Sequence, residues 1–337
     1  MINSADLKPI TGTFLAPIVN DTGFNNWGLA EWEANFRLIK SLGMDTVIVP
    51  VVEFQVAGHR QSALDPRNTT WPEDPNLLSM CFRLCDKYNL QFYLGGVCNV
   101  DNVYAGKWEE EIEENRRFYE MMLDRFGQRK CLHGLYVCLE AIPWQYHWPE
   151  TVEGILTEMR RLAPGKKTLL SPSLKMPKGD MSTIYTPEEF IDVYGRMFDR
   201  LKGKLDYCAW QDKYNKVDCV LGEMQTHELD VWYRATGKIC RRNGIGLWAN
   251  VESFDRPTAE VAAYRQADYR TLIAKIQAAS PHVDKLITFE YFTCMSPHAE
   301  WGSAGRLLHR YVEALGMDKT KIAWPEDERV SMGSVRS

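Results

Sequence analysis

The sequence predicts a single (β/α)₈ barrel, a closed parallel sheet surrounded by helices. Short β-branched or apolar runs alternate with longer helical patterns, as they do in βα units that build a parallel sheet. Eight such units follow one another within 337 residues. No GxGxxG motif follows the first strand, which argues against an open dinucleotide-binding sheet. Eight sequential units close readily into a barrel, and barrels run to about 250 residues or more as one domain.

The expected strands are short apolar runs, each long enough for one stave of a barrel. They are expected at residues 12–19, 45–54, 91–97, 134–141, 168–174, 207–212, 246–253 and 285–292. No linker or low-complexity tract separates a second domain, so one barrel is expected over residues 1–337. The polar, proline-containing stretch from Ala57 to Asn76 is expected to be an irregular βα loop over the barrel mouth.

The helical segments between the strands carry apolar residues on one face, as with Trp32, Phe36 and Ile39. Their ends are marked as well. Thr186 and Glu189 have the spacing of a capping box at a helix start. Glycines that act as helix stop signals follow three of the helices, at Gly43, Gly127 and Gly244.

Composition restricts the class of protein. A net charge of -5 and the absence of a lysine or arginine run argue against a nucleic-acid partner. The amino terminus lacks the order of a secretory signal, and no apolar stretch of about 18 residues could span a bilayer. The chain as written is expected to be cytoplasmic, or periplasmic or secreted if it is a trimmed mature form. Nine cysteines without a CxxC pair indicate reduced thiols, and we expect no metal and no cofactor.

Polar residues end several of the expected strands, at the end of the barrel where enzymes of this architecture have their active sites. They are Glu53, Glu140, Gln211, Asp212, Glu252 and Glu290. A carboxylate buried without a partner costs several kcal/mol. Five acids around one mouth therefore indicate a function, although each could equally be bonded to an arginine or a backbone amide.

Glycoside hydrolysis requires two carboxyl groups on either side of one bond. Strands four and seven face each other across a barrel, so Glu140 is the predicted acid/base and Glu252 the predicted nucleophile. Glu290 or Asp212 could replace one of them. Asn250 shares a strand face with Glu252 and could hydrogen-bond a sugar hydroxyl.

Aromatic side chains are common in the same loops, and sugar rings pack on such flat surfaces. The predicted substrate-binding residues are Glu53, Trp144, Trp148, Gln211, Tyr214, Asn250 and Tyr291. For Trp210 and Trp248, which lie inside strands, burial in the core is the better interpretation. His147 and His298 could bind substrate or could simply be solvated.

Four segments carry a resemblance to a known family: TGTFLAPIVNDTGFNNWGLAEWEANFRLIKSLGMDTVIVPVVEF, YCAWQDKYN, LWANVESF and FEYFTCMSP. The chain resembles the barrel family called domain of unknown function 4434, which is grouped with TIM-barrel glycoside hydrolases. The resemblance covers most of the chain. It implies a TIM barrel and carbohydrate chemistry, such as bacterial-type polysaccharide utilisation, and leaves the sugar open.

A weaker similarity links the chain to the large clan of retaining glycosidases. That clan has its acid/base after strand four and its nucleophile after strand seven, where this chain has Glu140 and Glu252. An asparagine usually precedes the strand-four glutamate of the clan, and Leu139 stands there in this chain.

Two other functions stay open at this point. A metal-dependent sugar isomerase or epimerase could use Glu140, Asp212 and Glu290 as ligands. A barrel that binds glycans without turnover would need the aromatic residues and not the acids. The sequence does not decide the oligomeric state.

Overall fold

A computed structural model describes residues 7–18, 24, 26–66, 74–139, 147–174, 185–212, 226–255 and 265–325 of the chain. Eight parallel strands form a closed sheet in the order β1-β11-β8-β7-β6-β5-β4-β2, and β2 pairs again with β1. They are β1 (Ile10–Phe14), β2 (Thr46–Val56), β4 (Gln91–Asn99), β5 (Leu132–Val137), β6 (Lys167–Leu170), β7 (Tyr207–Gln211), β8 (Gly246–Glu252) and β11 (Lys285–Phe289). The predicted (β/α)₈ barrel is confirmed.

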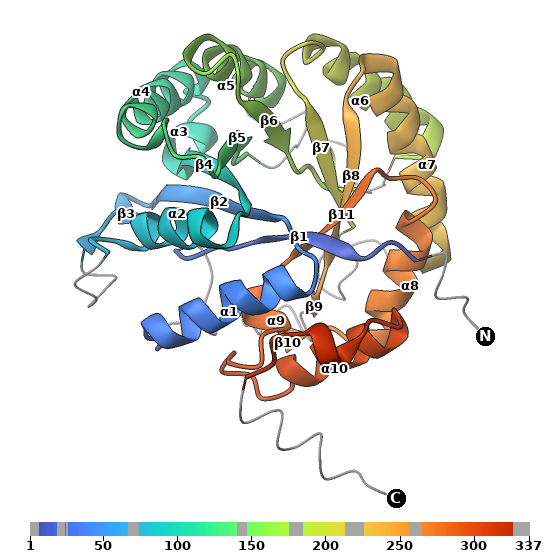
Figure 1. The fold of residues 1–337 in the computed structure, drawn as a ribbon. Coiled ribbons are helices and arrows are strands. Elements are labelled where there is room, and N and C mark those ends of the chain that lie inside the picture. The colour runs from blue at the N-terminus through green and yellow to red at the C-terminus, as the bar shows by residue number, and fades with distance from the viewer. Residues whose placement is uncertain are drawn as a thin grey trace, which may run out of the picture.

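Helices surround the strands, which run through the centre of the molecule (Figure 1). They are α1 (Leu29–Ser41), α2 (Leu77–Tyr88), α3 (Val100–Tyr104), α4 (Trp108–Phe126), α5 (Trp148–Leu162), α6 (Pro187–Arg200), α7 (Thr226–Asn243), α8 (Tyr269–Ala279), α9 (Tyr291–Cys294) and α10 (Ala304–Ala314), with a 3₁₀ turn at Lys319–Lys321. None of the helices in the described ranges is long and apolar enough to cross a membrane.

Each expected strand overlaps an observed one, but several ends differ. The first strand ends at Phe14 and the last at Phe289, both earlier than expected. After Phe289 the chain turns into α9, so Glu290 and Tyr291 lie beyond the strand. The fifth expected strand is shorter as well, although Ser173 still forms a bridge with Gln211.

The stretch after the second strand is more ordered than expected. β2 continues to Val56, and β3 (His59–Ser62) folds back antiparallel to it. Gly58, with a φ of 75°, forms the turn between them in a backbone conformation that suits glycine. The prediction of an irregular loop was wrong for these residues; Arg67 to Glu73 of the same stretch lie outside the described residues.

The barrel has two apolar cores, one inside the ring of strands and one between the strands and the helices. Each strand sends one residue into the inner core, namely Phe14, Ile48, Tyr93, Tyr136, Leu169, Ala209, Trp248 and Ile287. The outer core fills the space between strands and helices, and it contains Trp210 beside Phe190 and Phe198. Both strand tryptophans are therefore core residues, as predicted. The inner core also fixes which residues of each strand face inward, because strand side chains alternate.

The predicted helix signals are present. The Glu189 backbone N–H donates to the Thr186 hydroxyl at 3.2 Å, and the Thr186 backbone N–H donates to the Glu189 carboxylate at 2.8 Å. Gly43 and Gly244 follow their helices in the left-handed region, with φ values of 84° and 67°. Gly127 ends α4 without that conformation.

Glu111 of α4 is a fully buried acid outside the barrel. Its Oε1 atom accepts hydrogen bonds from the Asn99 backbone N–H at 3.2 Å and from the Asn115 amide at 3.4 Å. Its Oε2 atom has no hydrogen-bond partner among the described residues. Burial raises the pKa of Glu111 to about 7, and the nearby Glu114 adds to this effect.

Stability should therefore depend on pH through Glu111. The folded chain holds this proton more tightly than the unfolded chain, so the free energy of unfolding falls as the pH rises from about 4.5 to about 7. Glu111→Gln removes the titration, so we expect the variant to gain on the order of 1–3 kcal/mol over wild type between pH 5 and pH 8. Urea unfolding at both pH values measures the difference.

The control is Glu113→Gln on the same helix. Arg116 and Arg117 hold the pKa of the Glu113 carboxyl at about 2, so this substitution should leave the dependence between pH 5 and pH 8 unchanged. Equal pH dependence of wild type and Glu111→Gln would contradict the assignment.

Candidate functional site

Three predicted residues face the inside of the barrel where β7 and β8 end. Trp248 and Ala209 belong to the inner core. By alternation, Asn250 and Glu252 share the side of Trp248, and Gln211 shares the side of Ala209. Gln211 and Asn250 are direct neighbours in the ladder between the two strands. Glu252, Asn250 and Gln211 thus lie together on the inner face, at the end where barrel enzymes bind substrates.

Gln211 and Asn250 differ in how many of their side-chain polar atoms form hydrogen bonds. The Gln211 amide donates to the Ser171 carbonyl at 2.6 Å, and its oxygen accepts from the Ser173 hydroxyl at 3.4 Å. Asn250 is 1% exposed, and its Oδ1 atom has no hydrogen-bond partner within the described part of the chain. A buried acceptor of this kind costs about 1–3 kcal/mol if it stays unsatisfied, and a substrate hydroxyl would satisfy it.

Asp212 lies on the opposite side of the sheet from Gln211. Its carboxylate forms an ion pair with Lys275 of α8 at 3.0 Å, and both side chains are 0% exposed. The Asp212 carboxylate also accepts the backbone N–H of Glu252 at 3.2 Å. The sequence raised Asp212 as an alternative catalyst; in the structure its carboxylate faces α8 and not the inside of the barrel.

Glu290 is buried between the end of β11 and the segment after β1. Its carboxylate accepts the Ala16 backbone N–H at 3.0 Å and the Thr293 hydroxyl at 2.6 Å. Burial raises its pKa to about 7, and these two hydrogen bonds oppose the increase. The other alternative catalyst is therefore bound on both oxygens by its own chain.

Glu53 lies outside the barrel. It pairs with Arg60 of β3 and accepts the Ser62 hydroxyl at 3.3 Å. It lines a depression of about 830 Å³ together with Val97 of β4 and Phe118 of α4. The sequence predicted substrate binding for Glu53; the structure places it beside α4, next to a register shift between β2 and β4 at Val51 and Glu53.

Two of the predicted sugar-binding aromatics are core residues. Trp148 is 5% exposed and belongs to the outer core. Tyr291 is fully buried in the same core, where its hydroxyl donates to Asn35 at 3.1 Å. Both side chains are thus almost completely covered by protein. Glu140, Trp144 and Tyr214 lie outside the described residues, so their roles stay predictions.

A buried polar cluster around Asn35 of α1 was not foreseen. The Asn35 Oδ1 atom accepts from Tyr291 and, at 2.7 Å, from Ser296. Its amide donates to the Glu31 carbonyl at 2.8 Å and lies 3.0 Å from Nδ1 of His298. His298 therefore helps to anchor α1, and His147 is exposed at the start of α5. An asparagine on the apolar face of a predicted helix was the available signal.

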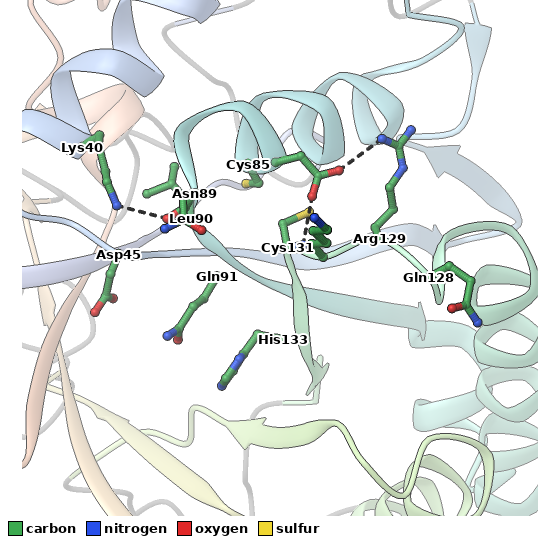
Figure 2. A pocket seen from close by; sticks show the side chains of 12 residues that line it. Lys40, Asp45, Cys85, Asn89, Leu90, Gln91, Gln128, Arg129, Cys131 and His133 are labelled. Carbon is green, nitrogen blue, oxygen red and sulfur yellow. Dashed lines mark hydrogen bonds and ion pairs between the residues drawn. The ribbon is translucent and has the colours of Figure 1, made fainter.

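A second depression, of about 540 Å³, lies at the opposite, amino-terminal end of the strands (Figure 2). Gln91 and His133 point into it from the starts of β4 and β5, with Asp45 and Lys40 nearby (Figure 2). Burial lowers the pKa of His133, and the neighbouring lysines lower it further. Because barrel enzymes bind their substrates at the carboxyl ends of the strands, we place the candidate site there and not in this second depression.

The described residues contain no group of three or more histidine, cysteine or acidic side chains that could hold a metal ion. Two of the three ligands considered for a metal-dependent isomerase, Asp212 and Glu290, are bonded to other groups of the protein. Their carboxylates therefore do not converge on one ion.

The profile of the domain of unknown function DUF4434 matches residues 10–301 of the chain. The chain belongs to the DUF4434 family. No curated protein matches this DUF4434 protein by sequence.

Among solved structures, a Bacteroides thetaiotaomicron protein described as a candidate α-L-fucosidase is similar, with a TM-score of 0.79 and 26% identity over 94% of this chain and 96% of that one. A β-galactosidase from Marinomonas ef1 has a TM-score of 0.54 and 11% identity over 93% of this chain and 61% of that one. A xylanase of glycoside hydrolase family 10 from Thermobacillus composti has a TM-score of 0.51 and 12% identity over 92% and 97%. The DUF4434 protein thus has the TIM-barrel fold of glycoside hydrolases.

The assignment of Tyr291 to the core can be tested with Tyr291→Phe. Loss of the hydroxyl leaves the Asn35 oxygen with its remaining donor, so we expect the free energy of unfolding to fall by about 1 kcal/mol. Urea unfolding measures this change. Tyr269→Phe, at a residue that is 42% exposed, is the matched control and should be neutral. A Tyr291→Phe variant as stable as the control would show that the buried hydrogen bond contributes little.

Proposed function

We propose that this DUF4434 protein is a glycoside hydrolase that retains configuration, with Glu252 as nucleophile and Glu140 as acid/base. The observation that supports it most is the place of Glu252 at the carboxyl end of β8, on the inner side of the barrel beside Asn250 and Gln211. Barrel enzymes carry catalytic residues at such strand ends.

The proposed chemistry follows from two carboxyl groups in different states. Glu140 in its acid form donates a proton to the leaving oxygen while the Glu252 carboxylate attacks the anomeric carbon. Water then hydrolyses the glycosyl ester after Glu140, now a carboxylate, removes its proton. The Asn250 Oδ1 atom, which has no hydrogen-bond partner among the described residues, and the Gln211 amide would bind sugar hydroxyls near this bond.

The other acids are less suited to the nucleophile's role. Glu290 is bound on both carboxylate oxygens, Asp212 faces α8, and Glu53 faces α4. Of these described acids, Glu252 lies at the carboxyl end of a strand and on the inner side of the sheet, as a nucleophile in a barrel should. Sugar stacking on Trp144 and Tyr214 is also part of the proposal. Neither residue is among those that the structure describes.

The similar Bacteroides protein suggests the first sugar to test. Its name points to α-L-fucosides, and its chain is matched over 96% of its length at 26% identity. We therefore propose an α-L-fucoside as the first substrate, followed by β-galactosides and β-xylosides.

Turnover of a panel of 4-nitrophenyl glycosides tests the proposal. In Glu252→Gln we expect kcat/KM to fall by at least about 10³-fold, since the nucleophile is lost. Glu290→Gln is the matched control, and its kcat/KM should fall by no more than about tenfold. Full activity in Glu252→Gln or in Glu140→Gln would overturn the assignment.

Other outcomes would favour the other functions. Binding of an oligosaccharide without release of any sugar would support a glycan-binding barrel. Sugar isomerisation that a chelator abolishes would support the metal-dependent alternative.

A crystal structure can test the retaining mechanism before the substrate is known. The carboxyl groups of Glu140 and Glu252 should lie about 5–5.5 Å apart if Glu252 attacks the sugar directly. A separation of about 6.5–9.5 Å would leave room for a water molecule and indicate inversion instead. Carboxyl groups that point away from a common space would show that the pair is wrong.

A further inference from the structure

The backbone of Glu252 is held by side chains at the place where its neighbouring strand ends. The β7–β8 ladder ends with Gln211 opposite Asn250. The carbonyl of Asn250 accepts the Asp212 backbone N–H at 3.3 Å, so the backbone carbonyl of Asn250 points toward β7. Residues two apart in a strand point their backbone groups to the same side. The N–H and C=O of Glu252 therefore also face β7, but within the described part of the chain β7 ends at Gln211 and offers no further strand residue to bind them.

Asp212 and Lys275 bind these two groups. The Glu252 N–H donates to Asp212 Oδ2 at 3.2 Å, and the Lys275 ammonium donates to the Glu252 carbonyl at 2.9 Å. The ammonium also donates to Asp212 Oδ1 at 3.0 Å. The ion pair thus replaces the missing rung of the ladder, and it does so from the helix side of the sheet.

Lys275 is unusual for its place in α8. It lies on the buried face of that helix, beside Leu272 and Ile276. Removing two charges from water carries a large desolvation cost, and a well-packed apolar pair of the same volume is often as stable or more stable. Packing stability alone therefore does not explain why a lysine stands at this position. The hydrogen bond from Lys275 to the Glu252 carbonyl offers another explanation.

We propose that Asp212 and Lys275 are positioning residues that fix the backbone of Glu252, and through it the direction of its carboxylate, in the barrel mouth. This inference rests on the proposed function of Glu252. The pair does not touch the substrate. It sets the φ and ψ of the last residue of β8, and an error of about 1 Å in a reacting group can cost about 10²-fold in rate.

The test separates positioning from stability with single and double variants. Lys275→Met alone and Asp212→Leu alone each leave one charge buried without its partner, so both should lower the melting temperature strongly. The double variant Asp212→Leu/Lys275→Met removes both charges, so its melting temperature should return near that of wild type. Its kcat should nevertheless stay about 10²-fold below wild type with KM little changed, because the missing rung is not restored.

Two further variants sharpen the comparison. Val152→Ala, in the fully buried face of α5, lowers stability far from Glu252 and should leave kcat unchanged below its melting temperature. Asp212→Asn/Lys275→Met keeps an oxygen that can accept the Glu252 N–H, so its kcat should lie between those of wild type and the leucine double variant. Wild-type kcat in the leucine double variant would overturn the proposal, because it would leave the pair a purely structural role.

The same variants answer the question if no glycoside is hydrolysed. That result would refute the proposed function, whereas the positioning role would be judged from crystal structures of wild type and of the double variant. A Glu252 carboxylate displaced by about 1 Å or more in the double variant would support positioning. A carboxylate in the same place in both structures would overturn it. If the leucine variant does not fold, the asparagine variant is compared in its place.

Discussion

The pairing of β1 with β2 determines the rest of this structure. Gly12, Thr13 and Phe14 lie opposite Thr46, Val47 and Ile48, and this short ladder joins the two ends of the sheet into a barrel. Closure gives every strand an inside and an outside, so that neighbouring residues of one strand enter different environments. It also brings the carboxyl ends of all eight strands to one mouth.

The buried acids around this mouth show how strongly a single residue step matters. Glu252 faces inward, while Asp212 follows Gln211 by one residue and faces the helices, where it meets Lys275. Glu290 lies one residue past the end of β11 and is bound between two segments of its own chain. Similar carboxyl groups thus lie in different surroundings, and the side of the sheet decides whether a carboxyl group faces the inside of the barrel or a buried lysine.

Much of the fold could be predicted because its signals are local. Apolar runs located all eight strands, and the spacing of Thr186 and Glu189 located a helix start. Alternation from Trp248 also placed Asn250 and Glu252 on one face. Trp148 and Tyr291, which were expected to bind substrate, are buried in the outer core, because an aromatic residue near a loop can pack in a core as readily as on a sugar.

Contacts between distant residues were harder to foresee. Lys275 meets Asp212 from 63 residues away, and no spacing rule connects them. The register shift in β2 next to Glu53, which lies beside α4, likewise leaves no mark in the sequence. A lysine or an asparagine on the apolar face of a helix, as at Lys275 and Asn35, was nevertheless visible as an anomaly and is the kind of signal to follow in related chains.

The hairpin of β2 and β3 has a consequence for the behaviour of the protein in solution. A closed barrel offers no free strand edge to another molecule, but β3 adds one, since its far side pairs with no other strand among the described residues. Such an edge can recruit a strand from a second chain and start aggregation. His59, Arg60 and Gln61 are exposed along it, and Arg60 also contacts Glu114 of α4 at 3.2 Å. A short, polar and cationic strand that forms an ion pair with the nearest helix is a poor template for intermolecular β-pairing. The hairpin can therefore extend from the barrel without promoting aggregation.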